Sequence, residues 1–475
     1  MEIQEIKSPP YPKQSTKNQT IKLTTKNVIQ ILTKMLHKIH ERVQRIKERV
    51  SGIHHSIKFG LKYHLNKNES LLKHVIFMGI MTTIANLFAV GLNIYAARRL
   101  DLGDYGALGS LIAIIFIFST TFAAVHMTIT RFVSHYKVKA RFEEINSLLK
   151  KSFIFFFFVG LAIFIATLCL SPVIKEFLHL DAEMPIIMLG LILWLIPLCA
   201  VMVGGLRGLQ KFRWLAASGF ADGGFRFVIG VILIGTLSMG VLGGISAIFI
   251  ATFLSFMIGF IALFTFMTKH EYKIDLKEIW KYGWPVFIAL ISLGVIANSD
   301  IIIVKHFFSA RNAGQYTVAS IIATLLFFTS NIFSLTMFPK VTDLHSNGKD
   351  SSKLLKSNLF YMLIISIITY VLFHFYADSI IKFFFSQKYH VSPIVNTLIP
   401  AYSFLALANI LVIYDIAIGK TWHIYLLAGF AILQPLIIWF FHPALLAVAL
   451  IQVCTMTALF YILLISTRRA LIFHQ

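Results

Sequence analysis

Four ionisable residues stand inside long apolar stretches of this 475-residue chain and are the first candidates for chemistry. A charged side chain at the centre of a bilayer costs roughly 2.5–3.5 kcal/mol on insertion scales, so it needs a partner, a water-filled cavity or a neutral state. Residues of this kind are typical of ligand sites and ion pathways. They are Asp222, Arg226, Asp300 and Asp415.

Asp222 and Arg226 are four residues apart, which places them on one face of a helix. In one interpretation Arg226 contacts an anionic group of a ligand, while Asp222 tunes the arginine or binds a proton or Na⁺. In the other, the two charges neutralise each other and only orient the helix. The sequence leaves both interpretations open.

Membrane-spanning helices must position these residues. The chain is 57% hydrophobic and 13% charged, with 44 phenylalanines, whereas soluble domains carry about a quarter charged residues. Continuous apolar runs of about 20 residues are typical of transmembrane helices. We therefore predict an all-α membrane protein with about twelve such helices. The predicted spans are 75–97, 106–128, 152–171, 186–206, 215–237, 240–267, 284–304, 315–338, 358–376, 393–419, 422–441 and 443–466.

Lysine and arginine accumulate on one side of these helices. With twelve spans, most of the 43 basic residues lie on the side of the N-terminus, and cytoplasmic loops collect such residues. We therefore predict that both termini are cytoplasmic. The net charge of +22 is then explained by orientation and by contact with anionic lipids, so we expect no nucleic-acid partner.

The predicted loops leave no room for a catalytic domain. The longest of them fall near 129–151 and 172–185, and no nucleotide-binding, zinc-protease or serine-hydrolase motif occurs. The three cysteines lie far apart inside predicted helices and show no metal-ligand spacing. We expect a protein that is not an enzyme and has no metal site.

Residues 1–70 form a basic extension ahead of the first span. Its start is polar and predicted to be disordered, whereas residues 22–57 have apolar side chains at heptad spacing among many lysines and arginines. One interpretation is an amphipathic helix on anionic lipids through residues 22–58; others are a short coiled coil that pairs two copies and a loosely ordered tail. The excess of one charge sign favours the membrane surface.

The two halves of the chain look alike at an offset of about 208 residues. Residues 104–108 match 312–316, and 130–134 match 338–342. Since both halves start on the same side, we predict two pseudo-symmetric six-helix bundles, related by an axis along the membrane normal, around a central cavity. The predicted parts are 1–70, 71–268 and 269–475.

The same offset pairs Ala97 with Lys305 and Arg98 with His306. If the pseudo-symmetry axis holds, Arg98, Arg99 and Lys305 could surround the outer mouth of the cleft and hold an anionic head group. Arginine binds phosphate through two parallel hydrogen bonds, and lysine acts as a point charge. The alternative is that they are anchors whose charged ends reach the level of the lipid head groups.

A set of short motifs follows in order along residues 71–466. The motifs are 97–100, 104–106, 130–134, 205–212, 298–300, 313–316 and 338–341. This ordered set resembles the polysaccharide-transporter branch of the multidrug/oligosaccharidyl-lipid/polysaccharide (MOP) exporter superfamily, the superfamily of the MATE transporters. Two departures are the long basic extension and spans that are less cationic than the family's usual central cavity.

The resemblance implies a flippase that moves a polyprenyl-(pyro)phosphate-linked oligosaccharide, of the O-antigen (lipopolysaccharide) type, to the outer leaflet of a prokaryotic inner membrane by alternating access. It implies a cavity role for Asp300, contact of Arg226 with the lipid pyrophosphate, polysaccharide polymerase machinery as a partner, and energy from substrate consumption or from Na⁺ or H⁺. From position alone, we expect interfacial water around Asp300 and an interfacial Asp415.

Two rival functions remain. A cation-coupled multidrug exporter of the same superfamily is mildly favoured by three intramembrane aspartates against one arginine, because acidic cavities bind cations. A membrane-embedded glycan polymerase or ligase is disfavoured, because the predicted outer loops are too short to fold around a site.

Overall fold

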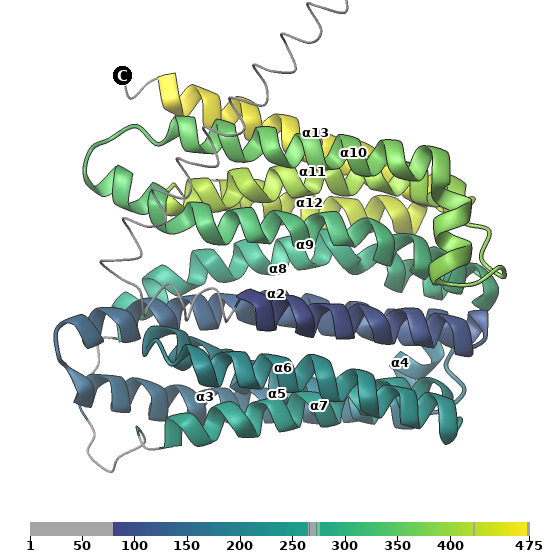
Figure 1. Cartoon of the computed structure of the whole chain (residues 1–475), viewed down its shortest axis with the longest axis horizontal. Coiled ribbons are helices and arrows are strands. Elements are labelled where there is room, and N and C mark those ends of the chain that lie inside the picture. The colour runs from purple at the N-terminus through teal and green to yellow at the C-terminus, as the bar shows by residue number, and fades with distance from the viewer. Residues whose placement is uncertain (1–78, 265, 267–271, 273–275, 421–422, 473–475) are drawn as a thin grey trace, which may run out of the picture. The chain divides into compact units, whose positions relative to one another are not determined.

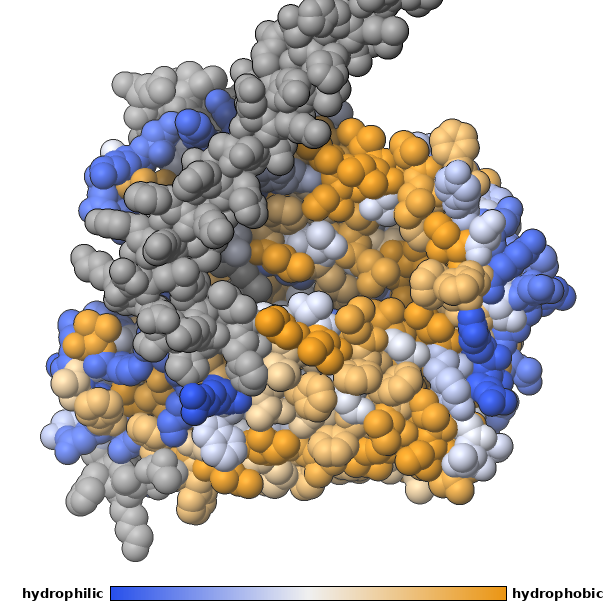
Figure 2. Space-filling view, viewed as in Figure 1, coloured by the Kyte–Doolittle hydropathy of each residue, from blue (hydrophilic) through white to orange (hydrophobic). Residues whose placement is uncertain are grey.

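The computed structural model describes residues 79–264, 266, 272, 276–420 and 423–472, and this part of the chain is helical without any β-strand. The predicted amphipathic helix over 22–57 lies outside the described residues and stays a prediction. The labelled helices run side by side (Figure 1). Apolar residues form a broad band between two hydrophilic ends (Figure 2), as a protein embedded in a bilayer requires.

Twelve helices in the described ranges are long and apolar enough to cross a membrane, which confirms the predicted number. Most extend beyond the predicted apolar runs. The first has no label in Figure 1 and spans Gly79–Arg99. The others are α2 (Leu102–Val138), α3 (Phe142–Cys169), α5 (Met184–Gly208), α6 (Phe212–Gly230) continued by the π-helix η1 (Val231–Thr236), α7 (Gly240–Phe264), α8 (Leu276–Phe307), α9 (Ala310–Ser346), α10 (Ser352–Phe384), α11 (Ser392–Ala417), α12 (His423–Phe440) and α13 (Leu445–Ile472).

A short additional helix, α4 (Ser171–Phe177), follows the third span. It begins with proline at its first turn, a position where the missing N–H costs nothing. We call one side of the helices the predicted outer end and the opposite side the predicted inner end. The predicted outer end carries α4, Arg99, Phe307 and the end of α10. These names follow from the distribution of lysine and arginine.

The two halves repeat the same packing. In the first half α5 contacts α2, α3 and α7, and α6 packs on α7. In the second half α11 contacts α9, α10 and α13, and α12 packs on α13. In each half, therefore, the fourth span contacts the second, third and sixth spans. We call the helices up to α7 the first bundle and α8–α13 the second bundle; the predicted boundary at 268/269 stays a prediction.

The bundles meet along α2, which packs against both α8 and α9. Glycines allow the closest approach at the predicted outer end. A Cβ on Gly314 would lie 1.9 Å from the carbonyl oxygen of Leu102, and one on Gly109 would lie 2.2 Å from the Thr317 methyl group. No side chain fits at either distance, so these glycines hold α2 against α9.

We expect Gly314→Ala to lower the thermal stability of the purified protein, by about 1–3 kcal/mol, the usual cost of overpacking. The added methyl group would push α9 away from the backbone of Leu102. Gly219→Ala is the matched control, because nothing lies within 4 Å of its Cβ position on α6. Thermal unfolding in detergent micelles compares the two, and equal melting temperatures would contradict the assignment.

Candidate functional site

Asp222 and Arg226 form an ion pair inside the first bundle. The Nη2 atom of Arg226 lies 2.6 Å from Oδ2 of Asp222, and the Thr252 hydroxyl on α7 donates a 3.2 Å hydrogen bond to Oδ1. The two side chains keep 22% and 33% of their surface exposed, with arginine the lower. The structure thus brings the two residues together as their spacing on α6 requires.

The ion pair leaves much of the arginine's bonding capacity unused. The Nε atom of Arg226 is buried without a hydrogen-bond partner among the described residues, although guanidinium offers five N–H donors. The pair faces Thr252, whereas Phe225 and Val228 occupy the exposed face of α6. A half-buried guanidinium with spare donors can bind an anion that enters the first bundle.

Asp300 is fully buried in the second bundle, so the expectation that interfacial water surrounds it is wrong. The Tyr316 hydroxyl on α9 donates a 2.8 Å hydrogen bond to Oδ2 of Asp300. The Tyr402 hydroxyl on α11 donates a 2.7 Å bond to the carbonyl oxygen of Ala297 nearby. These two helices cover the carboxylate, while its Oδ1 atom has no hydrogen-bond partner within the described part of the chain.

A network of uncharged polar side chains adjoins this carboxylate. The Gln434 amide donates to the Ile296 carbonyl at 2.8 Å and to Oε1 of Gln452 at 2.7 Å. The Thr455 hydroxyl donates to Oε1 of Gln434 at 3.2 Å. Sequence reasoning missed this network, although a glutamine within an apolar run is a usable signal. Together the groups form a polar interior that joins α8, α12 and α13.

The second-bundle site fits one small cation or a proton better than a metal centre. Its ligating atoms would be oxygens, which suit hard cations, and Oδ1 of Asp300 is available to one. Within the described ranges no group of three or more histidines, cysteines and carboxylates could hold a metal ion.

Arg98 and Arg99, the first two members of the predicted ring, lie at the predicted outer end. The Nε atom of Arg98 donates a 2.7 Å hydrogen bond to the carbonyl oxygen of Phe384, and its guanidinium also donates to Phe383. Arg99 is exposed, with its guanidinium carbon 5.8 Å from the centre of the Tyr95 ring. Arg98 is therefore engaged by the protein itself.

Lys305, the third member, is 4% exposed and lies in the electrostatic field of Asp104 and Asp181. The attraction of these two carboxylates offsets part of the cost of burying the ammonium group. In this conformation Arg98 donates to protein carbonyls, Lys305 is buried, and Arg99 is exposed beside Tyr95.

Asp415 lies two residues before the end of α11, near the predicted inner end, but it is buried between helices. It is 1% exposed, and its Oδ2 atom lies 2.9 Å from Nδ1 of His423. The Thr467 hydroxyl donates to the same oxygen at 3.1 Å, and Nε2 of His423 lies 2.6 Å from the Ser466 hydroxyl. Segments of α11, α12 and α13 surround Asp415 and exclude water from it. The sequence of one span does not show which other helices will cover its side chains.

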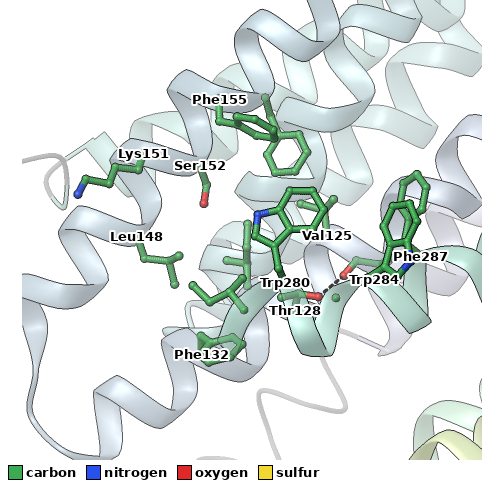
Figure 3. Close-up of a pocket in the computed structure, with 15 residues that line it drawn as sticks. Val125, Thr128, Phe132, Leu148, Lys151, Ser152, Phe155, Trp280, Trp284 and Phe287 are labelled. Carbon is green, nitrogen blue, oxygen red and sulfur yellow. Dashed lines mark hydrogen bonds between the residues drawn. The ribbon is translucent and has the colours of Figure 1, made fainter. Parts of the chain in front are cut away.

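An apolar groove of about 340 Å³ lies between α2, α3 and α8 (Figure 3). Trp280, Trp284 and Phe155 form much of its wall, while Lys151 and Ser152 supply polar groups on the α3 side. Such a lining suits a hydrocarbon chain better than a sugar. Sequence reasoning missed the groove, although two tryptophans one turn apart are a recognisable signal of a membrane-interface surface.

The comparisons with known proteins agree with this architecture. A family model described as "Polysaccharide biosynthesis protein" matches residues 71–345, more than half of the chain. A search of curated protein sequences gives no significant match. The match confirms the family resemblance that the ordered motifs predict.

Solved structures show the same fold at low sequence identity. An inward-facing multidrug resistance MATE family transporter of the MOP superfamily has a TM-score of 0.67 and 14% identity, covering 83% of this chain and 97% of its own. The lipid II flippase MurJ, in an inward closed conformation, has a TM-score of 0.67 and 18% identity, covering 83% and 87%. A Vibrio cholerae MATE transporter has a TM-score of 0.61 and 14% identity, covering 85% and 97%.

We expect Tyr316→Phe to destabilise the protein by about 1–3 kcal/mol, the cost of leaving a buried acceptor unsatisfied. The substitution removes the hydroxyl that donates to Oδ2 of Asp300. Tyr361→Phe is the control, because Tyr361 is exposed on α10. Thermal unfolding of both variants tests this, and a Tyr316→Phe protein as stable as the control would refute it.

Proposed function

Because this chain belongs to the polysaccharide biosynthesis protein family and has the fold of MOP-superfamily transporters, we propose that it is a flippase for a polyprenyl-(pyro)phosphate-linked oligosaccharide of the O-antigen type. It moves this substrate by alternating access from the cytoplasmic to the outer leaflet of a prokaryotic inner membrane, with both termini in the cytoplasm. The observation that carries the proposal is the Arg226 side chain inside the first bundle, which is 22% exposed and whose buried Nε donor has no hydrogen-bond partner among the described residues.

Arg226 contacts the substrate's pyrophosphate in this proposal. Guanidinium presents parallel N–H groups that match phosphate oxygens, and the buried Nε atom is one donor without a present partner. Asp222 holds the guanidinium in place and competes with the phosphate for it. This competition keeps binding reversible, which a transporter needs in order to release its cargo.

The polyprenyl tail stays in hydrocarbon throughout this proposal. The groove beside Trp280 and Trp284 offers the tail an apolar wall, while the glycan passes between the two bundles when they move apart. A route of this kind avoids exposing sugar hydroxyls to lipid, where each unpaired polar group costs roughly 2–7 kcal/mol.

Asp300 is the coupling site in this proposal, with Na⁺ or H⁺ as the ion. Its Oδ1 atom is free of hydrogen bonds in the described structure, and the side chain is sealed from water by α9 and α11. A cation bound there neutralises a buried charge, so its arrival and departure favour different packings of the second bundle.

A cation-coupled multidrug exporter is the second candidate. The acidic site in the second bundle supports it, because the same carboxylate could bind the coupling ion. One MATE transporter that shares the fold is described as a multidrug resistance transporter. The lipid-linked substrate is preferred because the family model concerns polysaccharide biosynthesis.

Reconstituted protein distinguishes the two candidates. Proteoliposomes receive a fluorescent polyprenyl-pyrophosphate oligosaccharide, and a membrane-impermeant quencher reports which leaflet the label occupies. Protein-dependent movement between leaflets supports the flippase, and repeating it with a Na⁺ or proton gradient identifies the coupling ion. Gradient-driven efflux of a cationic dye without any glycan movement would replace the flippase with the exporter.

We expect Arg226→Ala to abolish flipping, because the phosphate loses its cation, and Asp222→Asn to slow flipping only severalfold. Arg226→Lys should retain a small part of the activity, since lysine keeps the charge but not the paired donors. Arg213→Ala, an exposed arginine on the same helix, is the control. Initial flipping rates in the quenching assay decide, and wild-type rates in both Asp222→Asn and Arg226→Ala would remove the pair from the mechanism.

We expect Asp300→Asn to remove the effect of an ion gradient while leaving gradient-independent exchange of substrate. The asparagine amide is neutral, so it does not bind the coupling cation as the carboxylate does. Asp378→Asn, an exposed aspartate on α10, serves as the control. Flipping is measured with and without the gradient, and full gradient stimulation in Asp300→Asn would place coupling elsewhere.

A further inference from the structure

Arg207 is a cation of the first bundle whose charge has no carboxylate partner among the described residues. It is the last residue but one of α5, at the predicted inner end. Its Nε atom is buried without a hydrogen-bond partner in the described ranges, and the ion pairs of the described chain do not include it. A charge that is removed from water without a counter-charge is costly, so this guanidinium suits an anion that comes from outside the protein.

Neighbouring lysines at the same end are used differently. Lys137 donates a 2.9 Å hydrogen bond to the carbonyl oxygen of Leu209, just after α5. Lys211 donates a 2.7 Å hydrogen bond to the carbonyl oxygen of Ala262 in the last turn of α7. Carbonyls at the end of a helix have no partner within the helix, so these lysines stabilise helix ends. The Nε atom of Arg207 makes no such bond within the described chain.

His126 on α2 lies near this guanidinium. Its Nδ1 atom is also buried without a hydrogen-bond partner among the residues described, and its ring lies in the electrostatic field of Arg207. Two glycines bring the helices together here. A Cβ on Gly204 would lie 3.0 Å from the His126 carbonyl oxygen, and one on Gly208 would lie 2.6 Å from the Val133 side chain. Because Arg207 lies between these glycines in the sequence, both unpartnered nitrogens belong to the contact of α2 with α5.

The same side of α5 faces the Asp222–Arg226 pair deeper in the bundle. Cys199, eight residues before Arg207, lies in the electrostatic field of Asp222. Positions i and i+8 belong to one stripe of a helix, and eight residues rise by about 12 Å. The first bundle therefore has two cationic positions along one side of α5, Arg207 nearer the predicted inner end and Arg226 deeper. Of these two, Arg226 is the one that pairs with a carboxylate in the described structure.

We propose that Arg207 and His126 form a capture site for the pyrophosphate group of a lipid-linked substrate, which reaches this site before it reaches Arg226. The choice of this anion rests on the proposed function. Arg207 binds the phosphate oxygens through the parallel N–H groups of its guanidinium, and His126 donates one hydrogen bond from its ring. The anion thereby supplies the counter-charge that Arg207 otherwise does not have.

The two cationic positions differ in what the anion must displace. At Arg207 it meets a cation that pairs with no carboxylate of the described chain, whereas at Arg226 it competes with Asp222, whose Oδ2 atom lies 2.6 Å from Nη2. We therefore expect the tighter binding at the predicted inner end and the weaker binding deeper in the bundle. This order allows the substrate to be collected at low concentration and then passed to a position that releases it.

Binding of inorganic pyrophosphate to the purified protein tests the proposal without a glycan and without transport. Full-length protein that carries Arg226→Gln is used in a neutral detergent, so that the capture site is the one under test. Titration calorimetry measures the affinity for pyrophosphate, and thermal unfolding is recorded with and without it. We expect pyrophosphate to raise the melting temperature, because a ligand that binds only the folded protein stabilises it.

Variants in this background separate a binding role from a structural role. We expect Arg207→Gln to lower the affinity about tenfold, since charge-assisted hydrogen bonds are lost. It should also raise the melting temperature of the ligand-free protein, whereas a structural arginine would lower it on removal. His126→Phe should lower the affinity severalfold. Arg213→Gln is the matched control, because it removes the same charge from an exposed arginine at the start of α6 and should change neither quantity.

Two results would overturn the proposal: no binding of pyrophosphate to the Arg226→Gln protein, or an affinity that Arg207→Gln leaves unchanged. Should Arg207→Gln fail to fold, an unchanged affinity in His126→Phe would have the same force. Phosphatidylglycerol is titrated in parallel, and Arg207-dependent binding of this lipid without any binding of pyrophosphate would assign the site to a membrane head group instead. A negative flipping assay leaves this test intact, and a failed capture site leaves the flippase assignment intact.

Discussion

Every polar backbone group within a bilayer must find its partner inside the protein, and the rest of this structure follows from that constraint. The described chain meets it with helices alone, and many hydroxyl side chains return to the helix as well: Thr128 donates to the Ala124 carbonyl and Ser292 to the Ile288 carbonyl, four residues back. Hydroxyls that satisfy themselves in this way do not hold helices to one another. The few that reach across helices, or have no partner, mark the places where the protein binds or moves.

Those few groups differ between the bundles in a complementary way. The first bundle holds an arginine that is partly buried and whose Nε donor is not used by Asp222, which suits an anion. The second bundle holds a sealed aspartate with one oxygen free of partners, which suits a small cation. A transporter that exchanges an anionic lipid against a cation needs both kinds of site, and keeping them in separate bundles prevents each from neutralising the other.

The two bundles contact each other along α2 and at the predicted outer end. Glycine contacts hold α2 against α9 without side chains between them, so the helices can pivot there with little interlocking. Arg98 and His306 add hydrogen bonds to backbone carbonyls across the same end. Arg98 makes two such bonds and His306 one, all to carbonyls at helix ends, so these contacts can break without unfolding either bundle.

The sequence by itself determined twelve spans, their repeat, the pairing of Asp222 with Arg226 and the family, because these follow from local apolarity, spacing and ordered motifs. It predicted the sides of the membrane as well, through the distribution of lysine and arginine. Only the tertiary structure decided that Asp300 and Asp415 are buried, that Gln434 and Gln452 join in one network, and that Arg98 caps α10. Burial and partner choice depend on which helix faces cover a side chain, and a single span does not contain that information.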